Sequence, residues 1–330
     1  MELRVPDPER RHREVLLAQE VARPRHGPPF DWRDGSWRLT FRRPEADRLE
    51  YLIGIDGSFG PDPANDRRVR APFGPKSVVE WAEYVPPAWL DSVARAGPIE
   101  QLEIRCRRLV ARVAVLLYST PEPPGADAPL LVVHDGPEYA EYAGLTRFLD
   151  AMSRNRRVPP LRAALIPPVD RNETYSASAL YSAALVRELL PELTKHVPHG
   201  RRIGVGASLG ALALFHAHRR HPRAFDGLLL QSGSFFRQRY DKHEVTFKRY
   251  RRITRFVGTA LRASGSTRPI PVAITCGAAE ENRANNEGLA AALAAQGYPT
   301  SLALVRDAHN WTCWRDALDP HLPLLVEAVG

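Results

Sequence analysis

The pattern of hydrophobic and polar positions changes near residue 100. Before that point, short segments alternate apolar and polar residues, as in residues 37–41 and 49–55, and turn-rich stretches such as DGSFGPDPAND separate them. Alternation with a period of two is typical of strands that bury one face. We therefore expect a small β-rich, sandwich-like module over residues 1–99. A polar stretch at residues 9–21 could be helical, and the Pro- and Gly-rich residues up to about 35 predict a loosely packed arm.

Beyond residue 100, short apolar runs alternate with longer stretches whose apolar residues recur at intervals of three and four. The first two runs, at 99–104 and 110–117, predict antiparallel strands, and the longer stretches predict helices. Short buried strands that alternate with helices argue for a mostly parallel sheet covered on both faces, here over residues 100–330. Further strands are expected at residues 130–133, 163–166, 203–205, 228–230, 272–275 and 302–305, and helices near residues 138–152, 177–196, 209–220, 245–264, 282–296 and 311–329.

The strand at 203–205 leads into the segment GVGASLGA, which opens one of these helices. Small residues at Gly206 and Gly210 let the backbone turn sharply enough to hold Ser208 above the edge of the sheet. This arrangement is the nucleophile elbow of the α/β-hydrolase fold. A Gly-x-Ser-x-Gly match occurs by chance in on the order of one chain in fifteen, so the elbow depends on its context. The alternative is a serine that only caps the following helix.

Two later strands are followed by residues that would complete a catalytic triad. Parallel strands end at one edge of the sheet, and in this fold the nucleophile, the acid and the histidine follow in that chain order. CGAAEEN follows one strand, and DAHNW, with His309, follows the last. His309 could accept the proton of Ser208, while a carboxylate fixes its tautomer. Glu280 is the preferred acid, and Glu281 and Asp307 are alternatives. The histidine could instead be a surface residue, and either glutamate a solvated charge that favours the next helix.

An oxyanion hole requires two backbone N–H donors aimed at the charge that develops on the substrate. One would come from Leu209, directly after the elbow serine, and the other from the segment HDGPEY. Pro137 has no N–H group and cannot donate. Gly136 is therefore the preferred second donor and Glu138 the alternative. The same segment could also be a plain turn from strand to helix.

Six segments between residues 100 and 330 carry a family resemblance. They are HDGPEY, DRNETY, GASLGALALFHAHRRHP, LLLQSGSFF, CGAAEEN and DAHNWTCWRDAL. Together they resemble the enterochelin esterase family of the α/β-hydrolase superfamily, and DGSFGPDPANDRRV is similar to the end of the β-sandwich module that precedes the hydrolase domain in that family. The resemblance implies a serine esterase that opens ester linkages of iron-chelating siderophores. It places Ser208 as nucleophile, His309 as base and Glu280 as acid.

Other residues are candidate substrate contacts. Arg171 follows a strand at the same sheet edge and could bind a carboxylate or a catecholate, although a solvated loop position or an ion pair with Glu173 is an equal alternative. Phe235 and Phe236 could line an aromatic pocket or pack in the core. Residues 237–262 carry nine Arg and Lys against two acidic residues. This segment is either a solvated helix face or a positive rim that attracts an anionic ferric siderophore.

Composition and charge narrow the class of protein. The chain has 330 residues, a net charge of +8 and a pI near 9.7, but no nucleic-acid-binding motif accompanies the charge. Its three cysteines are far apart and form no C-x-x-C pair, which favours reduced thiols. The sequence contains no run of about 18 apolar residues, so no membrane-spanning helix is predicted. We expect a cytoplasmic protein that binds neither nucleic acid nor membranes.

The sequence thus predicts an α/β-hydrolase fold preceded by a small β-rich module. The expected activity is that of a serine esterase that acts on a small-molecule ester, with a ferric siderophore as a candidate, and that needs no cofactor and no metal. Two alternatives stay open, because a fold does not fix the reaction. One is a binding protein that keeps the scaffold with little or no catalysis, and the other is a peptidase or an acyltransferase. The oligomeric state is left open.

Overall fold

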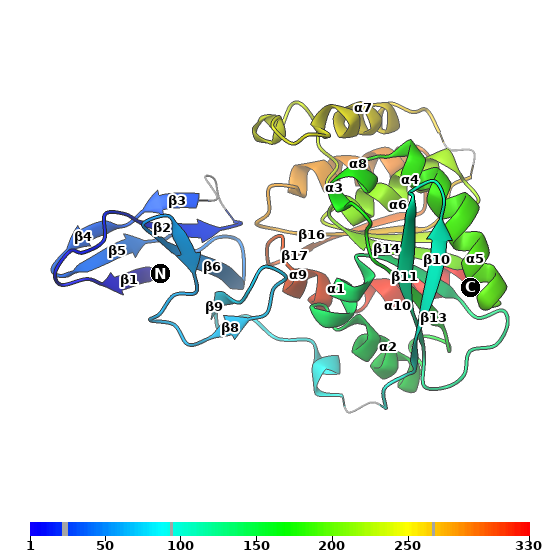
Figure 1. Ribbon diagram of the computed structural model, residues 1–330, viewed down its shortest axis with the longest axis horizontal. Helices are drawn as coiled ribbons and strands as arrows, with labels where there is room; N and C mark the ends of the chain where they lie inside the picture. Colours follow the sequence, from blue (N-terminus) through cyan, green and yellow to red (C-terminus); the bar gives the residue numbers. More distant parts are fainter. Residues whose placement is uncertain (22–25, 93–94, 266–267) are drawn as a thin grey trace.

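The computed structural model describes residues 1–21, 26–92, 95–265 and 268–330. Its main feature is an eight-stranded sheet in the order β10-β11-β13-β12-β14-β15-β16-β17 (Figure 1). β10 (Ile99–Cys106) and β11 (Ala111–Ser119) are antiparallel, β11 is antiparallel to β13, and the remaining pairs are parallel. The predicted, mostly parallel sheet is confirmed. Its parallel strands are β12 (Leu130–His134), β13 (Arg162–Ile166), β14 (Arg202–Ala207), β15 (Gly227–Gln231), β16 (Val272–Gly277) and β17 (Thr300–Val305).

Helices cover both faces of this sheet, which explains why its central strands β12 and β15 are buried at every position (Figure 1). One apolar cluster includes Leu212 of α6 and Ile253 of α7, and the other includes Phe148 of α2 and Leu322 of α10. Among the described helices, none combines the length and the apolar character needed to cross a membrane. The helices are α1 (Gly136–Glu141), α2 (Leu145–Arg154), α3 (Arg171–Thr174), α4 (Ala179–Ala184), α5 (Leu190–His196), α6 (Leu209–Arg220), α7 (Tyr250–Leu261), α8 (Arg283–Ala295), α9 (Trp311–Asp316) and α10 (His321–Val329).

Two stretches predicted as single helices are each divided in two. The stretch 138–152 is interrupted at Gly144, which has a φ of 60° and directly precedes α2. The stretch 311–329 is interrupted before α10, where Pro320 cannot donate a helical hydrogen bond. Both breaks occur at residues whose backbone is poorly suited to a helix interior.

The N-terminal residues form two small sheets, in the orders β1-β5-β4 and β3-β2-β6-β9-β8. The expected helix at 9–21 and the loose arm were wrong. β1 pairs with β5 and β2 pairs with β6, and Val15 and Leu17 of β2 are buried at a period of two. Residues 22–25 of the expected arm lie outside the described residues. These strands are β1 (Glu2–Pro6), β2 (Val15–Gln19), β3 (His26–Pro29), β4 (Asp31–Arg33), β5 (Ser36–Thr40), β6 (Arg48–Ile55), β7 (Ser58–Gly60), β8 (Arg68–Val69) and β9 (Lys76–Glu80).

We call residues 1–80 with these two sheets the N-terminal module; the predicted domain boundary at 99 stays a prediction. The module contacts the loop that follows β17, next to α9 (Figure 1). The Asp47 N–H donates to the Arg306 carbonyl at 2.7 Å. Buried Arg48 lies 3.1 Å from the carboxylate of buried Asp307. The module therefore holds the same loop that carries the candidate histidine.

Candidate active site

Ser208 lies in a strained turn between β14 and α6. Its φ of 55° and ψ of −123° lie in a region that residues with side chains rarely adopt, at a cost of about 1–3 kcal/mol. A Cβ at Gly206 would lie 2.8 Å from the carbonyl carbon of Gly210, so the turn has no room for a side chain there. The Ser208 N–H donates to the Gln231 carbonyl at 2.9 Å, which ties the turn to β15.

The loops after β16 and β17 bring Glu280 and His309 to this serine. Nε2 of His309 lies 3.1 Å from Oγ of Ser208, and Nδ1 lies 2.5 Å from Oε2 of Glu280. The ring of Trp314 packs edge-on against the imidazole, with 5.2 Å between centroids. A chain of hydrogen bonds therefore joins a buried carboxylate through an oriented imidazole to the serine hydroxyl.

Glu280 is fully enclosed by hydrogen-bond donors. Its Oε1 accepts from the Ser232 hydroxyl at 2.6 Å, the Gly277 N–H at 2.5 Å and the Cys276 thiol at 2.9 Å. Burial alone would raise the pKa of Glu280, but His309 and the hydrogen-bond donors outweigh it and hold the pKa below its ordinary value. The carboxylate thus stays ionised beside the imidazole.

The two alternative acids face other partners. Oε2 of Glu281 lies 3.6 Å from Nε2 of His243. Asp307 is paired with Arg48, and burial raises its pKa to about 6 even though the guanidinium opposes this shift. Of the three candidates, Glu280 is the carboxylate that the structure brings to the histidine. Sequence could not separate them, because all three lie close to the same two strand ends.

The candidate oxyanion donors both begin helices. Leu209 is the first residue of α6 and Gly136 is the first residue of α1, and the first N–H groups of a helix have no acceptor within it. Pro137 is in the first turn of α1, where its missing N–H removes no helical hydrogen bond. A Cβ at Gly136 would lie 2.3 Å from the backbone of Leu165, so α1 begins in direct contact with β13. The oxyanion role of both residues stays a prediction.

A buried histidine that the sequence did not single out connects these two helix starts. His134 ends β12, and its Nδ1 lies 3.1 Å from the Gly210 carbonyl while Nε2 lies 2.9 Å from the Tyr181 hydroxyl. Burial lowers the pKa of His134 to about 3, so the ring is neutral. A Cβ at Gly210 would lie 3.2 Å from Cβ of His134. The turn that begins α1 and the first turn of α6 are therefore held side by side.

Arg171 lies at the same edge, but its ion pair is not the one considered from sequence. Its guanidinium donates two hydrogen bonds of 2.9 Å to the carboxylate of Asp135. Glu173 instead pairs with Arg249 and Arg252 of the α7 region. The proposed Arg171–Glu173 pair was wrong, since an adjacent strand end supplies a carboxylate in the two-pronged geometry that guanidinium favours.

Phe235 and Phe236 lie in the core. Both are buried, Phe235 packs edge-on against Phe215, and Phe236 packs against Phe247. Neither belongs to the lining of the cavity at Ser208 in the part of the chain that the structure describes. Of the two alternatives considered from sequence, an aromatic pocket and core packing, the structure shows core packing. Burial there removes the large apolar surfaces of the two rings from water.

The cavity at Ser208 has a volume of about 240 Å³. It is lined by Pro72, Phe73, Asp135, Glu138, Arg171, Ser208, His309, Trp311 and Trp314. A neighbouring cavity of about 190 Å³ is lined by the same two tryptophans and by the same Pro72–Phe73 pair, which we call the Pro72–Phe73 corner. The N-terminal module therefore contributes to the walls through the loop between β8 and β9. Sequence reasoning missed this corner, the two tryptophans and Ser234, whose Oγ lies 3.1 Å from Oγ of Ser208. The WTCW pattern that begins two residues after His309 was the available signal.

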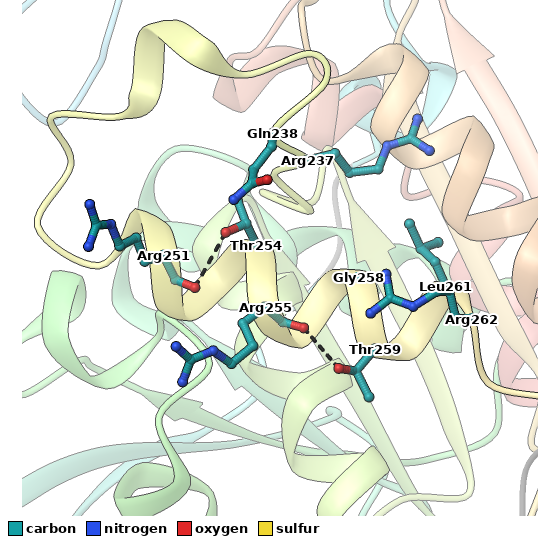
Figure 2. A pocket seen from close by; sticks show the side chains of 9 residues that line it. All are labelled: Arg237, Gln238, Arg251, Thr254, Arg255, Gly258, Thr259, Leu261 and Arg262. Atoms are coloured by element: carbon teal, nitrogen blue, oxygen red, sulfur yellow. Dashed lines mark hydrogen bonds between the residues drawn. The ribbon is translucent and has the colours of Figure 1, made fainter.

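Four cations of the 237–262 segment, Arg237, Arg251, Arg255 and Arg262, line a different hollow, which we call the basic groove (Figure 2). Figure 2 shows Arg237 directed toward α8 and Arg262 lying back along α7 beside Gly258. Arg251, Arg255 and Arg262 form no ion pair with any described residue. The basic groove shares no lining residue with the cavity at Ser208. The four cations of the basic groove are thus separate from the cavity at Ser208.

One group of side chains in the described ranges has ligand atoms close enough to hold a metal ion. His243, Glu244 and Glu281 have ligand atoms within 4.8 Å of one another. All three are at least partly exposed, and they do not line the cavity at Ser208. The triad chemistry does not require them.

A family model described as "Putative esterase" matches residues 108–325. The matched region runs from β11 into α10 and contains the Ser208 turn, Glu280 and His309. The chain belongs to this esterase family. The match covers most of the residues that build the eight-stranded sheet.

Named relatives lie among the enterobactin esterases. The iron(III) enterobactin esterase of a strain of Escherichia coli is 26% identical over 208 residues, which cover 59% of this chain and 52% of the relative. That of Dickeya dadantii is 28% identical over 235 residues, which cover 68% of this chain and 54% of the relative. The chain thus spans about half the length of the curated relatives it matches. The predicted resemblance is confirmed.

Solved structures of enterobactin esterases share the fold. The Shigella flexneri enzyme, crystallised in the presence of enterobactin, aligns with a TM-score of 0.78 at 19% identity and covers 100% of this chain and 93% of its own. The Salmonella typhimurium ferric enterobactin esterase gives a TM-score of 0.80 at 20% identity, with 99% and 93% covered. The predicted α/β-hydrolase fold with a β-rich N-terminal region is confirmed.

Proposed function

We propose that this protein is a serine esterase that hydrolyses carboxylic esters through an acyl-enzyme. The observation that carries the proposal is the hydrogen-bonded chain from Glu280 through His309 to Ser208, whose serine lies on a strained turn beside a cavity. A nucleophile, a base within hydrogen-bond reach and a group that orients the base are the parts required for covalent catalysis. Membership of the esterase family supports the same chemistry.

The proposed acylation begins when Nε2 of His309 accepts the proton of the Ser208 hydroxyl. The serine oxygen attacks the ester carbonyl carbon, and the N–H groups of Leu209 and Gly136 are the proposed donors to the resulting oxyanion. The imidazolium then gives its proton to the leaving alkoxide, and the alcohol departs. Glu280 holds Nδ1–H in place and stabilises the imidazolium without becoming protonated.

Deacylation repeats the same proton transfers with water. His309 accepts a proton from a water molecule that attacks the acyl carbon of the Ser208 ester. The proton then returns to Oγ as the carbon–oxygen bond breaks, which releases the carboxylic acid and restores the serine. The net reaction consumes one water for each ester bond and requires no added oxidant or metal.

We propose siderophore esters as the substrate class, for a protein located in the cytoplasm. Its relatives are named iron(III) enterobactin esterases, and structures of similar fold were solved in the presence of enterobactin or of 2,3-dihydroxy-N-benzoyl-serine. Phe73, Trp311 and Trp314 line the cavity at Ser208 and suit an aryl group, because aromatic rings pack favourably edge-on or offset.

Substitution of the proposed nucleophile tests the esterase proposal. Ser208→Ala should lower kcat for a p-nitrophenyl ester at least about a thousandfold, since loss of the nucleophile removes the covalent route. Fluorophosphonate should label the wild type at Ser208 and leave the variant unlabelled. Ser301→Ala, at an exposed position of β17, is the control and should behave as wild type. Wild-type turnover by Ser208→Ala would reject the proposal.

Mass analysis tests the substrate class separately. The purified protein is incubated with ferric and with iron-free trilactone siderophores. The expected products are the linear trimer, which is heavier than the ring by one water, and the dimer and monomer that further hydrolysis releases. Intact trilactones alongside rapid turnover of a small ester would reject the siderophore assignment and leave the esterase chemistry in place.

A further inference from the structure

Glu138 is an acidic residue in the cavity at Ser208 that forms no hydrogen bond or ion pair with the side chain of any described residue. It lies in the first turn of α1 and lines the cavity together with Ser208 and His309. Its Oε2 has almost no exposed surface and accepts no hydrogen bond from any described residue. Buried carboxylate oxygens are normally hydrogen-bonded, because an unmade bond leaves the cost of desolvation uncompensated.

The other charges of this cavity cancel one another. Asp135 and Arg171 form a two-pronged ion pair with both contacts at 2.9 Å. Glu138 is therefore the uncompensated charge among the residues that line the cavity, and its sign is negative. The guanidinium groups of Arg251, Arg255 and Arg262, which form no ion pair with a described residue, lie in the basic groove, which shares no residue with this cavity (Figure 2). Local charge thus disfavours an anionic group at Glu138 and favours a hydrogen-bond donor.

We propose that Glu138 is a specificity residue that accepts a hydrogen bond from a donor on the acyl part of the substrate. The donor is an amide N–H, a hydroxyl or an ammonium group within a few bonds of the ester carbonyl, since a cavity of about 240 Å³ contains both Glu138 and Ser208. This inference rests on the proposed esterase function and narrows its substrate class. Esters with a carboxylate at the same position should be poor substrates.

Two nearly isosteric substrates isolate this hydrogen bond. The first is the p-nitrophenyl ester of N-benzoylglycine, which has an amide N–H, and the second is the p-nitrophenyl ester of 4-oxo-4-phenylbutanoic acid, in which CH₂ replaces NH. For the wild type we expect kcat/KM to be about tenfold or more higher for the first, as for a hydrogen bond to a charged acceptor. Glu138→Leu should bring the ratio close to one, whereas Glu138→Gln keeps an acceptor and should retain part of the preference.

Glu141→Gln is the matched control. It removes the same charge from the same helix, but the Glu141 side chain is 46% exposed, pairs with Arg70 and does not belong to the cavity lining. Its substrate ratio should equal that of the wild type. A ratio near one in the wild type, or an unchanged ratio in a folded Glu138→Leu protein, would overturn the proposal. If circular dichroism shows that Glu138→Leu is unfolded, Glu138→Gln decides, and an unchanged ratio there would overturn it.

Binding separates this proposal from the esterase function. Calorimetry on Ser208→Ala compares N-benzoylglycinamide with 4-oxo-4-phenylbutanamide, and neither measurement requires turnover. Tighter binding of the N–H compound, lost in Ser208→Ala/Glu138→Leu, supports the role of Glu138 even if the wild type hydrolyses no ester. Equal affinities for the two compounds would overturn that role while the Ser208 chemistry stands.

Discussion

Hydrogen bonds from neighbouring residues distinguish Glu280 from the other carboxylates that could orient His309. Three donors hold Oε1, and His309 takes Oε2, so both oxygens of this buried carboxylate are satisfied. Glu281, one residue later, is oriented toward His243. Sequence placed a carboxylate in this loop, but adjacent residues in a turn point in different directions, and only the packed side chains distinguish them.

Replacing each glutamate tests this distinction. Glu280→Gln should lower kcat roughly 10³- to 10⁴-fold, because the amide can donate to Nδ1 and favour the wrong imidazole tautomer. Glu281→Gln should change kcat by less than about twofold, since surface substitutions outside such contacts have small effects. Steady-state kinetics on a p-nitrophenyl ester measures both. An equal loss in the two variants would contradict the assigned acid.

At the scale of the element, the start of α1 positions two proposed functional groups. Gly136 packs against β13 with no space for a side chain, and Glu138 follows it within the same turn. His134, directly before this turn, contacts the Gly210 carbonyl. The strand–helix alternation predicted such a turn, but it could not show that the turn presses against its neighbour's backbone.

Gly136→Ala tests this close contact. The added Cβ would lie 2.3 Å from the backbone of Leu165, so α1 must shift, and we expect a loss of about 1–3 kcal/mol in the free energy of unfolding. kcat/KM for a p-nitrophenyl ester should also fall, because the Gly136 N–H and Glu138 move together. Gly60→Ala is the control, since nothing lies within 4 Å of a Cβ built there. Equal stability of the two variants would contradict the packing argument.

At the scale of the whole molecule, the N-terminal module is tied to the histidine loop by a buried charge cluster. Arg48 contacts Glu50, Glu80 and Asp307, so one guanidinium serves three carboxylates. Burial raises the pKa of Asp307 to about 6, Arg48 opposes the shift, and nearby Glu50 adds to it. The contact between Arg48 of the N-terminal module and Asp307 of the loop that follows β17 therefore depends on the protonation of the Asp307 carboxyl group.

The pH dependence of stability tests this cluster. Because the folded pKa of Asp307 is about 6 and its ordinary value is 3.8, its contribution to stability is full below about pH 3.8 and is lost as pH rises through 6. The wild-type free energy of unfolding, minus that of Asp307→Asn, should fall by about 2 kcal/mol between pH 4 and 6. Urea denaturation across this range measures it. Parallel profiles for the two proteins would contradict the raised pKa.

The sequence determined the parts that local pattern encodes. Hydrophobic periodicity predicted the strands of the eight-stranded sheet and most of the helices that cover it, and the glycines around Ser208 predicted the sharp turn. Chain order then predicted that residues after β16 and β17 meet that turn, because parallel strands end at one edge. Where the pattern was short and mixed, as at residues 9–21, the prediction was wrong and pairing with β6 decided the outcome.

The tertiary structure decided which side chains became partners. In the folded protein, Glu280 contacts His309 and Arg171 forms an ion pair with Asp135. Phe235 is buried in the core, and Phe73 of the N-terminal module lines the cavity at Ser208. These contacts join residues far apart in the chain and depend on space, burial and competing donors at each point. Local sequence encodes backbone conformation, but the balance of desolvation and hydrogen bonding that selects a partner exists only once the elements have packed.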